Sequence, residues 1–300
     1  MSMFIDHRSA KVSIILTTYN GAKHIAETVE SIRNQTWVNW ELIIVDDGSE
    51  DDTAAVIAGI KDERIQFLLA GRSGINGKVK NLGLSKASGD LIAFIDHDDL
   101  WDLSKLEKQI AALQQYPEAG FCLTGGYNFR KTGEPIEHFY KQKNGIKRGN
   151  IFISLFNSEI AGFSQALMFR KECLAVAGHF KEVNSFADLD FIINLSRHFD
   201  AIILYESLVY RRLHDKSHSH LNWEKGYFEG LELIQSYKDD NLLPSKVVRN
   251  AFFRLYINFG EDCLQHREQA KAVKHFFYAW TYKFFSVVPV KKIVKAILFF

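Results

Sequence analysis

Three clusters of polar side chains follow apolar, β-branched runs in the first hundred residues. The clusters are Thr17-Thr18-Tyr19-Asn20, Asp46-Asp47-Gly48-Ser49 and Asp96-His97-Asp98-Asp99. In the third, three carboxylates within four residues repel one another unless a cation or a cationic ligand offsets their charge. Mg²⁺ and Mn²⁺ prefer carboxylate oxygens and commonly take one or two of them together with substrate phosphates. This cluster therefore predicts a divalent metal site; the alternative is that Asp98 or Asp99 caps a helix over residues 103–113.

The elements that must position these clusters alternate between strand-like and helix-like patterns. Apolar runs at residues 11–17, 41–45, 65–69 and 91–95 predict strands, and apolar residues recur at helical spacing between them. Runs that are apolar throughout indicate burial on both faces, as in a parallel sheet covered by helices. Because ligands bind outside the carboxyl ends of such strands, an open α/β fold would bring the three clusters to one edge.

The rest of the chain follows a different pattern. Residues 124–149 are polar and rich in glycine, which predicts a long surface excursion. Strand and helix patterns resume at residues 164–170, 186–198 and 201–212. From Asn222 onward the pattern is helical only and dense in aromatic residues, which predicts a C-terminal helical extension.

Composition excludes several classes of protein. The chain carries 37 basic and 36 acidic side chains, and this balance argues against a general nucleic-acid binder. Its three distant cysteines cannot form a disulfide framework or a cysteine-only zinc site, which favours a reducing, cytoplasmic compartment. The sequence shows no secretory signal and no run of 18 apolar residues, so we expect no membrane-spanning helix.

The clusters stand in the order VSIILTTYNG, ELIIVDDGSEDDT and NLGLSKASGDLIAFIDHDDLW, which resembles the nucleotide-sugar-binding half of family-2 glycosyltransferases. The resemblance is strong over residues 11–106 and continues through SQALMFRKECLAVAGHF, FADLDF and YRRLHDKSHSH to about His220. It implies a GT-A fold: an open, mostly parallel sheet flanked by helices over residues 1–221. Residues 10–106 would then bind the nucleotide sugar, residues 107–221 would face the acceptor, and residues 222–300 would form the helical extension.

In this family the first loop holds and stacks on the nucleotide base. Thr17 and Tyr19 match that loop, and Asp47 matches the carboxylate that accepts a hydrogen bond from the base. Stacking suits any base, so Tyr19 does not select the nucleotide. The alternative for Tyr19 is a ring that packs on the core.

The resemblance also assigns roles to the carboxylate cluster and to a basic residue before it. Asp96 and Asp98 match the family's DxD motif, which holds the ribose and the metal on the diphosphate, and Asp99 would share the metal. Where the family commonly has Ala-Arg-Asn, this chain has Lys80 between Val79 and Asn81. A lysine supplies a point charge to phosphate without the planar fork of arginine. The alternative is that Lys78 and Lys80 lie on a solvated helix face.

In the second half, Asp188 matches the catalytic carboxylate of the family's Glu-Asp motif, although Ala187 replaces the glutamate. Asp190 is two residues further on, would point elsewhere on a helix, and is expected to be a cap or an ion-pair partner. His214 matches a family histidine near the diphosphate that sometimes binds the metal. Together with His218 and His220 it leaves two interpretations open: a zinc site, or a loop that closes over the donor.

These assignments imply an inverting glycosyltransferase that uses Mn²⁺ or Mg²⁺. Its donor would be a nucleotide sugar, UDP-linked, and its acceptor a glycan or lipid-linked glycan, as in cell-surface polysaccharide synthesis. An alternative is a nucleotide-sugar-binding module without transfer activity. A nucleotidyltransferase would carry a glycine-rich basic run after its first strand, where this chain has TTYNGAKH.

The C-terminal residues 290–300 suggest a membrane contact. On a helix after Pro289, the apolar Val290, Ile293, Val294, Ile297 and Leu298 share one face and three lysines share the other. A basic amphipathic helix of this kind can lie in the interface of an anionic membrane, which would place the protein at the inner face of the cell membrane. The alternative is a terminal helix that packs on the helices before it.

Overall fold

The computed structural model describes residues 10–140, 144–213 and 223–298. Its centre is a ten-stranded open sheet with the order β3-β2-β1-β4-β9-β6-β10-β5, to which β7 and β8 are joined at β6 and β10. The strands are β1 (Val12–Thr18), β2 (Trp40–Asp46), β3 (Ile65–Leu69), β4 (Leu91–Asp96), β5 (Leu100–Trp101), β6 (Ala119–Phe129), β7 (Pro135–His138), β8 (Ile146–Gly149), β9 (Leu167–Arg170) and β10 (Asp200–Arg212).

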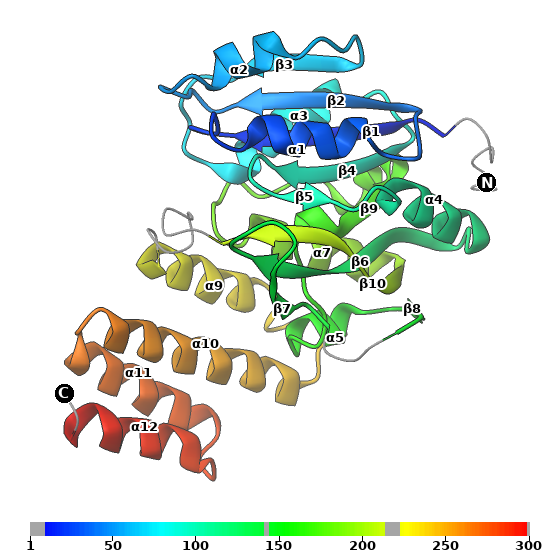
Figure 1. Ribbon diagram of the computed structural model, residues 1–300. Coiled ribbons are helices and arrows are strands. Elements are labelled where there is room, and N and C mark those ends of the chain that lie inside the picture. The colour runs from blue at the N-terminus through cyan, green and yellow to red at the C-terminus, as the bar shows by residue number, and fades with distance from the viewer. Residues whose placement is uncertain (1–9, 141–143, 214–222, 299–300) are drawn as a thin grey trace. The chain divides into compact units, whose positions relative to one another are not determined.

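Helices connect and cover these strands. In the sheet half they are α1 (Ile25–Arg33), α2 (Thr53–Gly59), α3 (Asn76–Lys86), α4 (Lys105–Gln115), α6 (Leu174–Ala177) and α7 (Ala187–His198), with short 3₁₀ turns at Ser164–Ala166 and Lys171–Cys173. The short helix α5 (Phe152–Phe156) follows β8 in the chain. In Figure 1, α1 crosses in front of the sheet and α3 lies behind it. This covering of both faces explains why β1 is buried at every position.

The sheet confirms the open α/β architecture. Strands β3, β2, β1 and β4 are parallel throughout, β6 and β10 are parallel to each other, and β9 runs antiparallel to both of its neighbours. In the register, Thr17 lies beside Asp96 on one side and Val45 on the other, and Thr18 lies beside Asp46. The three polar clusters therefore meet at one edge of the sheet, as the sequence predicted.

One local prediction and one alternative interpretation were wrong. Residues 124–129 are not part of a surface excursion, because they form the second half of β6 and most of them are buried. Asp98 and Asp99 do not cap the following helix, because β5 intervenes and α4 begins only at Lys105. The turn that leads into α4 is held by Asp102, whose Oδ1 accepts a hydrogen bond from the backbone N–H of Ser104 at 2.9 Å.

The chain divides into two compact units. The first comprises Met1–Phe152 and Ala161–Asp215, and the second comprises Ile153–Ile160 and Lys216–Phe300. The second unit contains α9 (Trp223–Tyr237), α10 (Ser245–Gln265), α11 (Gln269–Tyr282) and α12 (Val287–Leu298), packed around a core that includes Phe259, Cys263 and Phe276. Within the described ranges, none of the helices combines the length and the apolar character that crossing a membrane requires.

Candidate active site at the carboxyl edge of the sheet

Asp47 lies directly after β2 and is held by the loop that follows β3. Its Oδ1 accepts hydrogen bonds from the Ser73 backbone N–H at 2.7 Å and from the Ser73 hydroxyl at 2.8 Å. Its Oδ2 accepts one from the Gly74 N–H at 2.8 Å and forms an ion pair with Arg72. The loop can approach because Gly48 has a φ of +77° and a Cβ there would lie 2.8 Å from the Arg72 nitrogen.

Tyr19, predicted to stack on the base, is already covered on one face. The Arg72 guanidinium carbon lies 3.6 Å from the centroid of the Tyr19 ring, which is partly exposed. Arg72 thus makes two contacts at once: it stacks on Tyr19 and donates to Asp47. Tyr19 therefore does not pack into the core, which was the alternative.

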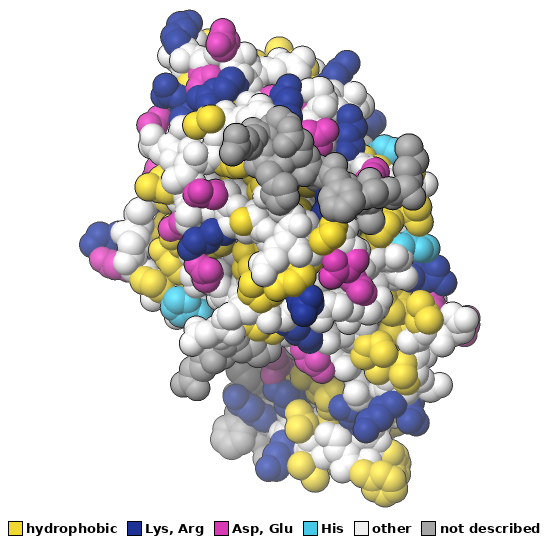
Figure 2. Space-filling view, turned by 90° about the vertical axis from the view of Figure 1, so that its right-hand side faces the viewer, with side chains coloured by type: hydrophobic (Ala, Val, Ile, Leu, Met, Phe, Trp, Pro, Cys, Tyr) yellow, Lys and Arg dark blue, Asp and Glu magenta, His cyan; other side chains and the backbone are white. Residues whose placement is uncertain are grey.

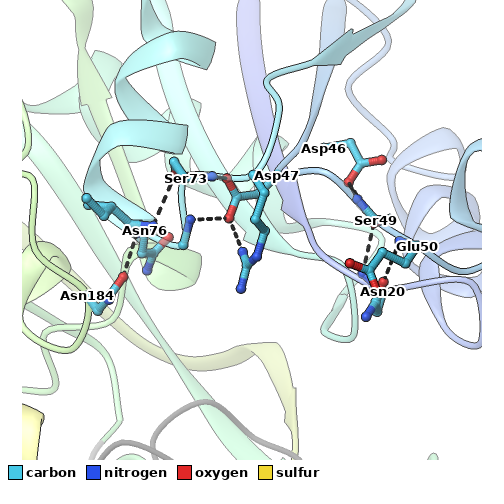
Figure 3. A network of polar contacts seen from close by, with 11 residues as sticks. Asn20, Asp46, Asp47, Ser49, Glu50, Ser73, Asn76 and Asn184 are labelled. Atoms are coloured by element: carbon cyan, nitrogen blue, oxygen red, sulfur yellow. Dashed lines mark hydrogen bonds and ion pairs between the residues drawn. The ribbon is translucent and has the colours of Figure 1, made fainter.

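The neighbouring Asp46 belongs to a separate network. Figure 3 shows Asp46 and Asp47 pointing different ways, Asp47 toward Ser73 and Asp46 toward Ser49. Asp46 Oδ1 accepts from the Ser49 N–H at 2.9 Å and from its hydroxyl at 2.6 Å, and the Ser49 hydroxyl oxygen in turn accepts from the Asn20 N–H at 2.8 Å. Asp46 therefore fixes the turns after β1 and β2, and Asp47 is the carboxylate directed at the Arg72 loop.

At the end of β4, Asp96 links strands that are distant in sequence. Its Oδ1 accepts a hydrogen bond from the Thr17 hydroxyl at 3.1 Å, and its Oδ2 accepts one from the Gln165 side chain. Burial raises the pKa of Asp96, and the carboxylates of Asp188 and Asp98 raise it further, while the positive charge of Lys80 opposes them. Thr17 is thus turned toward Asp96 in the sheet.

Asp98 and Asp99 form the turn that follows β4. Asp99 is almost fully buried, and its Oδ1 accepts a hydrogen bond from the Arg212 backbone N–H at 2.8 Å. Burial raises the pKa of Asp99 well above its usual value, and repulsion by Asp98 and Asp96 adds to the shift. The Arg212 side chain donates to the Asp98 carbonyl oxygen at 2.9 Å, so the end of β10 supports this turn.

Lys80 is not on a solvated face. Only 1% of its side chain is exposed, and its Nζ donates to the Ser164 hydroxyl at 2.8 Å and forms an ion pair with Asp188. Ser164 in turn donates to Asp188 Oδ2 at 2.6 Å, so both carboxylate oxygens of Asp188 are engaged. Lys78 is exposed, so the alternative of a solvated helix face describes Lys78 but not Lys80. Gly77 lets the start of α3 approach the backbone at Lys181, because a Cβ at Gly77 would lie 1.9 Å from the Lys181 carbonyl oxygen.

Asp190, two residues beyond Asp188 on α7, points elsewhere. It forms an ion pair with Lys181 at 2.8 Å, which confirms the expectation of an ion-pair partner. His214, predicted to lie near the diphosphate, is outside the described residues, as are His218 and His220. In the described part of the chain, no three His, Cys, Asp or Glu side chains are grouped so as to enclose a metal by themselves.

Three further residues belong to this edge of the sheet. Arg72 contacts Tyr19 and Asp47, Ser164 contacts Lys80 and Asp188, and Gln165 contacts Asp96. The buried Gln165 Oε1 and Thr18 Oγ1 have no hydrogen-bond partner among the residues that the structure describes. Such orphaned polar atoms are typical of sites that complete their hydrogen bonds with a ligand or with water.

Comparison with curated proteins finds similar glycosyltransferases. The chain is 35% identical over 130 residues to the putative teichuronic acid biosynthesis glycosyltransferase TuaG of Bacillus subtilis, covering 43% of this chain and 51% of TuaG. It is 39% identical over 102 residues to WfgD of Escherichia coli, a UDP-Glc:alpha-D-GlcNAc-diphosphoundecaprenol beta-1,3-glucosyltransferase, covering 34% and 40% of the two chains. The chain thus spans about half or less of these relatives' length.

Solved structures share the fold. S. aureus TarS 1-349 in complex with UDP-GlcNAc has a TM-score of 0.68 at 18% identity, covering 91% of this chain and 81% of that one. The mannosyltransferase PcManGT from Pyrobaculum calidifontis, in complex with GDP-Man and Mn²⁺, has a TM-score of 0.62 at 14% identity and covers 97% and 88%. These likenesses confirm the GT-A fold.

A protein-family model described as glycosyl transferase family 2 matches residues 13–174. The matched segment is more than half of the 300 residues and contains Tyr19, Asp47 and the Asp96–Asp99 turn. The chain therefore belongs to glycosyl transferase family 2.

Proposed function

We propose that this chain is an inverting glycosyltransferase that transfers a hexose from a UDP-sugar to a hydroxyl of a glycan or lipid-linked glycan. The observation that carries the proposal is the meeting of three features at one sheet edge: a stacking ring beside Asp47, the carboxylates of the β4 turn, and Asp188. The first suits a nucleobase, the second a metal-bound diphosphate, and the third a hydroxyl proton. A cytoplasmic location follows from the proposal, because nucleotide sugars are made there.

The contacts of Arg72 support the assignment of the base site. Its guanidinium is a flat group with N–H donors that stacks on Tyr19 and donates to Asp47. A uracil ring has the same two properties, a flat face and an imide N–H. We propose that Arg72 holds the place of the base and moves aside when the donor binds. Replacing Arg72 with Gln should then lower the Kd for UDP by a few-fold, since one exposed cation–π contact is worth about 0.5–1 kcal/mol.

The donor set at the end of β4 fits a hard divalent cation. Asp96, Asp98 and Asp99 crowd one turn. Burial raises the pKa of Asp96 and of Asp99, and repulsion from the neighbouring carboxylates, which a cation would relieve, raises both further. We propose that Asp98 holds Mn²⁺ or Mg²⁺, that Asp99 shares it, and that His214 is a further ligand. When bound, such an ion stabilises negative charge on the departing diphosphate. Asp96, already joined to Thr17, would hold the ribose.

Asp188 is the proposed general base. It would accept the proton of the acceptor hydroxyl as that oxygen attacks the anomeric carbon opposite the diphosphate. Lys80 and Ser164 hold its two oxygens. The positive charge of Lys80 offsets the repulsion between the carboxylates of Asp188 and Asp96. We therefore propose that Lys80 positions the base, in addition to the phosphate contact that the resemblance implies.

The relatives support the choice of substrates. WfgD is named for a UDP-glucose donor and a diphosphoundecaprenol-linked acceptor, and TuaG for teichuronic acid biosynthesis. The test is release of nucleoside diphosphate from a panel of UDP-glucose, UDP-galactose, UDP-GlcNAc and GDP-mannose with Mn²⁺. We expect slow hydrolysis of a UDP-sugar by the wild type and none by Asp188→Asn. Donor binding without hydrolysis or transfer to any glycan would instead indicate a binding module.

A further inference from the structure

The helices at the end of the second unit leave one apolar surface uncovered. Helix α12 packs inward through Ile293 and Ala296, so the alternative of a terminal helix that packs on the helices before it describes this part of α12. Other apolar side chains of α12 remain exposed. Val287, Val290, Val294 and Ile297 are between 44% and 64% exposed and follow one another at helical spacing. We call these four residues the α12 stripe; the side chain of Leu298 lies outside the described residues.

Aromatic side chains continue the stripe at the turn between α11 and α12. Phe277, Trp280, Phe284 and Phe285, here called the aromatic turn, contact one another in sequence, and Phe284 stacks on Trp280 with ring centroids 4.5 Å apart. Phe285 is 97% exposed, and Trp280 donates its indole N–H to the Phe284 carbonyl oxygen at 2.7 Å. Exposed rings that are held by one another form a preformed contact surface rather than scattered surface residues.

The charged side chains of α11, α12 and the turn between them have one sign. From Gln269 to Phe300 the chain contains six lysines and no aspartate or glutamate. Lys292 pairs with Glu261 of α10, whereas Lys291 and Lys295 are exposed and no described carboxylate forms an ion pair with them. Figure 2 shows hydrophobic side chains beside Lys and Arg at the level of α11 and α12 in Figure 1.

We propose that the α12 stripe and the aromatic turn dock on an anionic lipid surface. Aromatic rings and valine side chains would enter the boundary between headgroups and acyl chains, and Lys291 and Lys295 would meet the headgroup phosphates. The charge pattern selects this occupant, because a lipid surface offers anionic headgroups directly above an apolar layer. The helix lies on the membrane in this arrangement and does not cross it. The proposal does not depend on the transfer activity.

Flotation of the full chain with vesicles tests the proposal. We expect binding to vesicles of 70% phosphatidylcholine and 30% phosphatidylglycerol, weaker binding at high salt, and little binding to phosphatidylcholine alone. The double variant Phe284→Ser, Phe285→Ser should lose at least about tenfold in partitioning, since burying one phenylalanine is worth about one factor of ten. Replacing both Lys291 and Lys295 with Gln should also cost about thirtyfold on anionic vesicles, at about 1 kcal/mol per lysine.

Matched controls come from the same unit. Phe228 on α9 is 63% exposed and Lys246 on α10 is exposed, and neither lies on α11 or α12. Phe228→Ser and Lys246→Gln should bind vesicles as the wild type does, and thermal melting of all variants checks that they fold. Equal loss in the controls, or no binding to anionic vesicles, overturns the proposal. It is also overturned if sedimentation shows a dimer that Phe285→Ser dissociates while vesicle binding is absent.

Discussion

Two groups of carboxylates stand at the ends of strands β2 and β4, on either side of β1, and their surroundings are opposite. Asp47 receives three hydrogen bonds from residues 73–74 and an ion pair from Arg72. The turn after β4 gathers Asp96, Asp98 and Asp99, where burial and mutual repulsion raise the pKa of Asp96 and Asp99. The sequences VDDGS and IDHDDL give little sign of this difference.

The comparison shows how one residue type supports two kinds of recognition at one sheet edge. A carboxylate surrounded by donors is held in one direction, so it suits an N–H of a ligand such as a base. Carboxylates that repel one another are stabilised by a cation, so they suit a metal on a diphosphate. The proposed reaction needs both, and Asp188 adds a third carboxylate whose charge Lys80 compensates.

The largest expected effect concerns Asp188. Asp188→Asn keeps the shape of the side chain but removes the proton acceptor, and loss of a positioned general base typically costs about 10²–10⁴-fold in rate. Steady-state kinetics should show this loss in kcat with donor affinity nearly unchanged. Asp190→Asn is the matched control on the same helix, and should affect stability through its pair with Lys181 more than rate. If Asp190→Asn loses kcat and Asp188→Asn remains active, the general base is Asp190 and the assignment to Asp188 is wrong.

A smaller effect is expected at Asp47. Asp47→Asn replaces a charged acceptor by a neutral amide that puts an N–H against some of its donors, and a hydrogen bond to a charged group is worth about 1.5–3 kcal/mol. Urea unfolding should therefore show a loss of stability of this order, together with about tenfold weaker UDP binding. Asp46→Asn tests the turn network by itself and should lose stability while UDP affinity changes less. Unchanged stability in Asp47→Asn would contradict the donor-rich environment.

The smallest expected effect is a pH dependence at Asp99. Its pKa is raised in the folded protein, so the folded state holds its proton to a higher pH than the unfolded chain does. The contribution of Asp99 to stability is therefore lost as pH rises from about 4 through the raised pKa. In metal-free buffer, Asp99→Asn should reduce this decline by about 1.4 kcal/mol per unit of pKa difference, measured by urea unfolding at a series of pH values. An identical pH profile in both proteins would contradict the raised pKa of Asp99.

The sequence predicted the sheet because its strands are apolar on both faces, and it missed the parts that depend on close backbone packing. Residues 124–129 were expected at the surface since Gly125 and Gly126 interrupt the apolar pattern. In the structure these glycines let β10 approach: a Cβ at Gly125 would lie 2.7 Å from the Glu206 carbonyl oxygen, and one at Gly126 would lie 2.2 Å from that of Val209. A glycine that marks a turn in sequence can serve strand packing in space.

The site was predictable where a motif is local and not where partners are distant. Asp47 and the Asp96–Asp99 turn stand out as clusters next to strand ends. The pairing of Lys80 with Asp188 joins residues 108 positions apart, so no local pattern announces it. Arg72 is a single arginine in a glycine-rich loop without periodicity, and only the fold shows that it covers Tyr19.

The most direct test of the central claim is calorimetric binding of UDP-glucose and UDP to wild type, Asp98→Asn and Asp47→Asn, each with Mn²⁺ and with chelator. The account predicts that Mn²⁺ strengthens wild-type binding, that Asp98→Asn binds weakly and equally in both conditions, and that Asp47→Asn is weakened but still gains from Mn²⁺. Outer-shell changes at metal sites already cost about 10–100-fold, so a direct ligand should cost at least as much. Binding that is equally tight with chelator in the wild type, or a full response to Mn²⁺ in Asp98→Asn, would contradict the account.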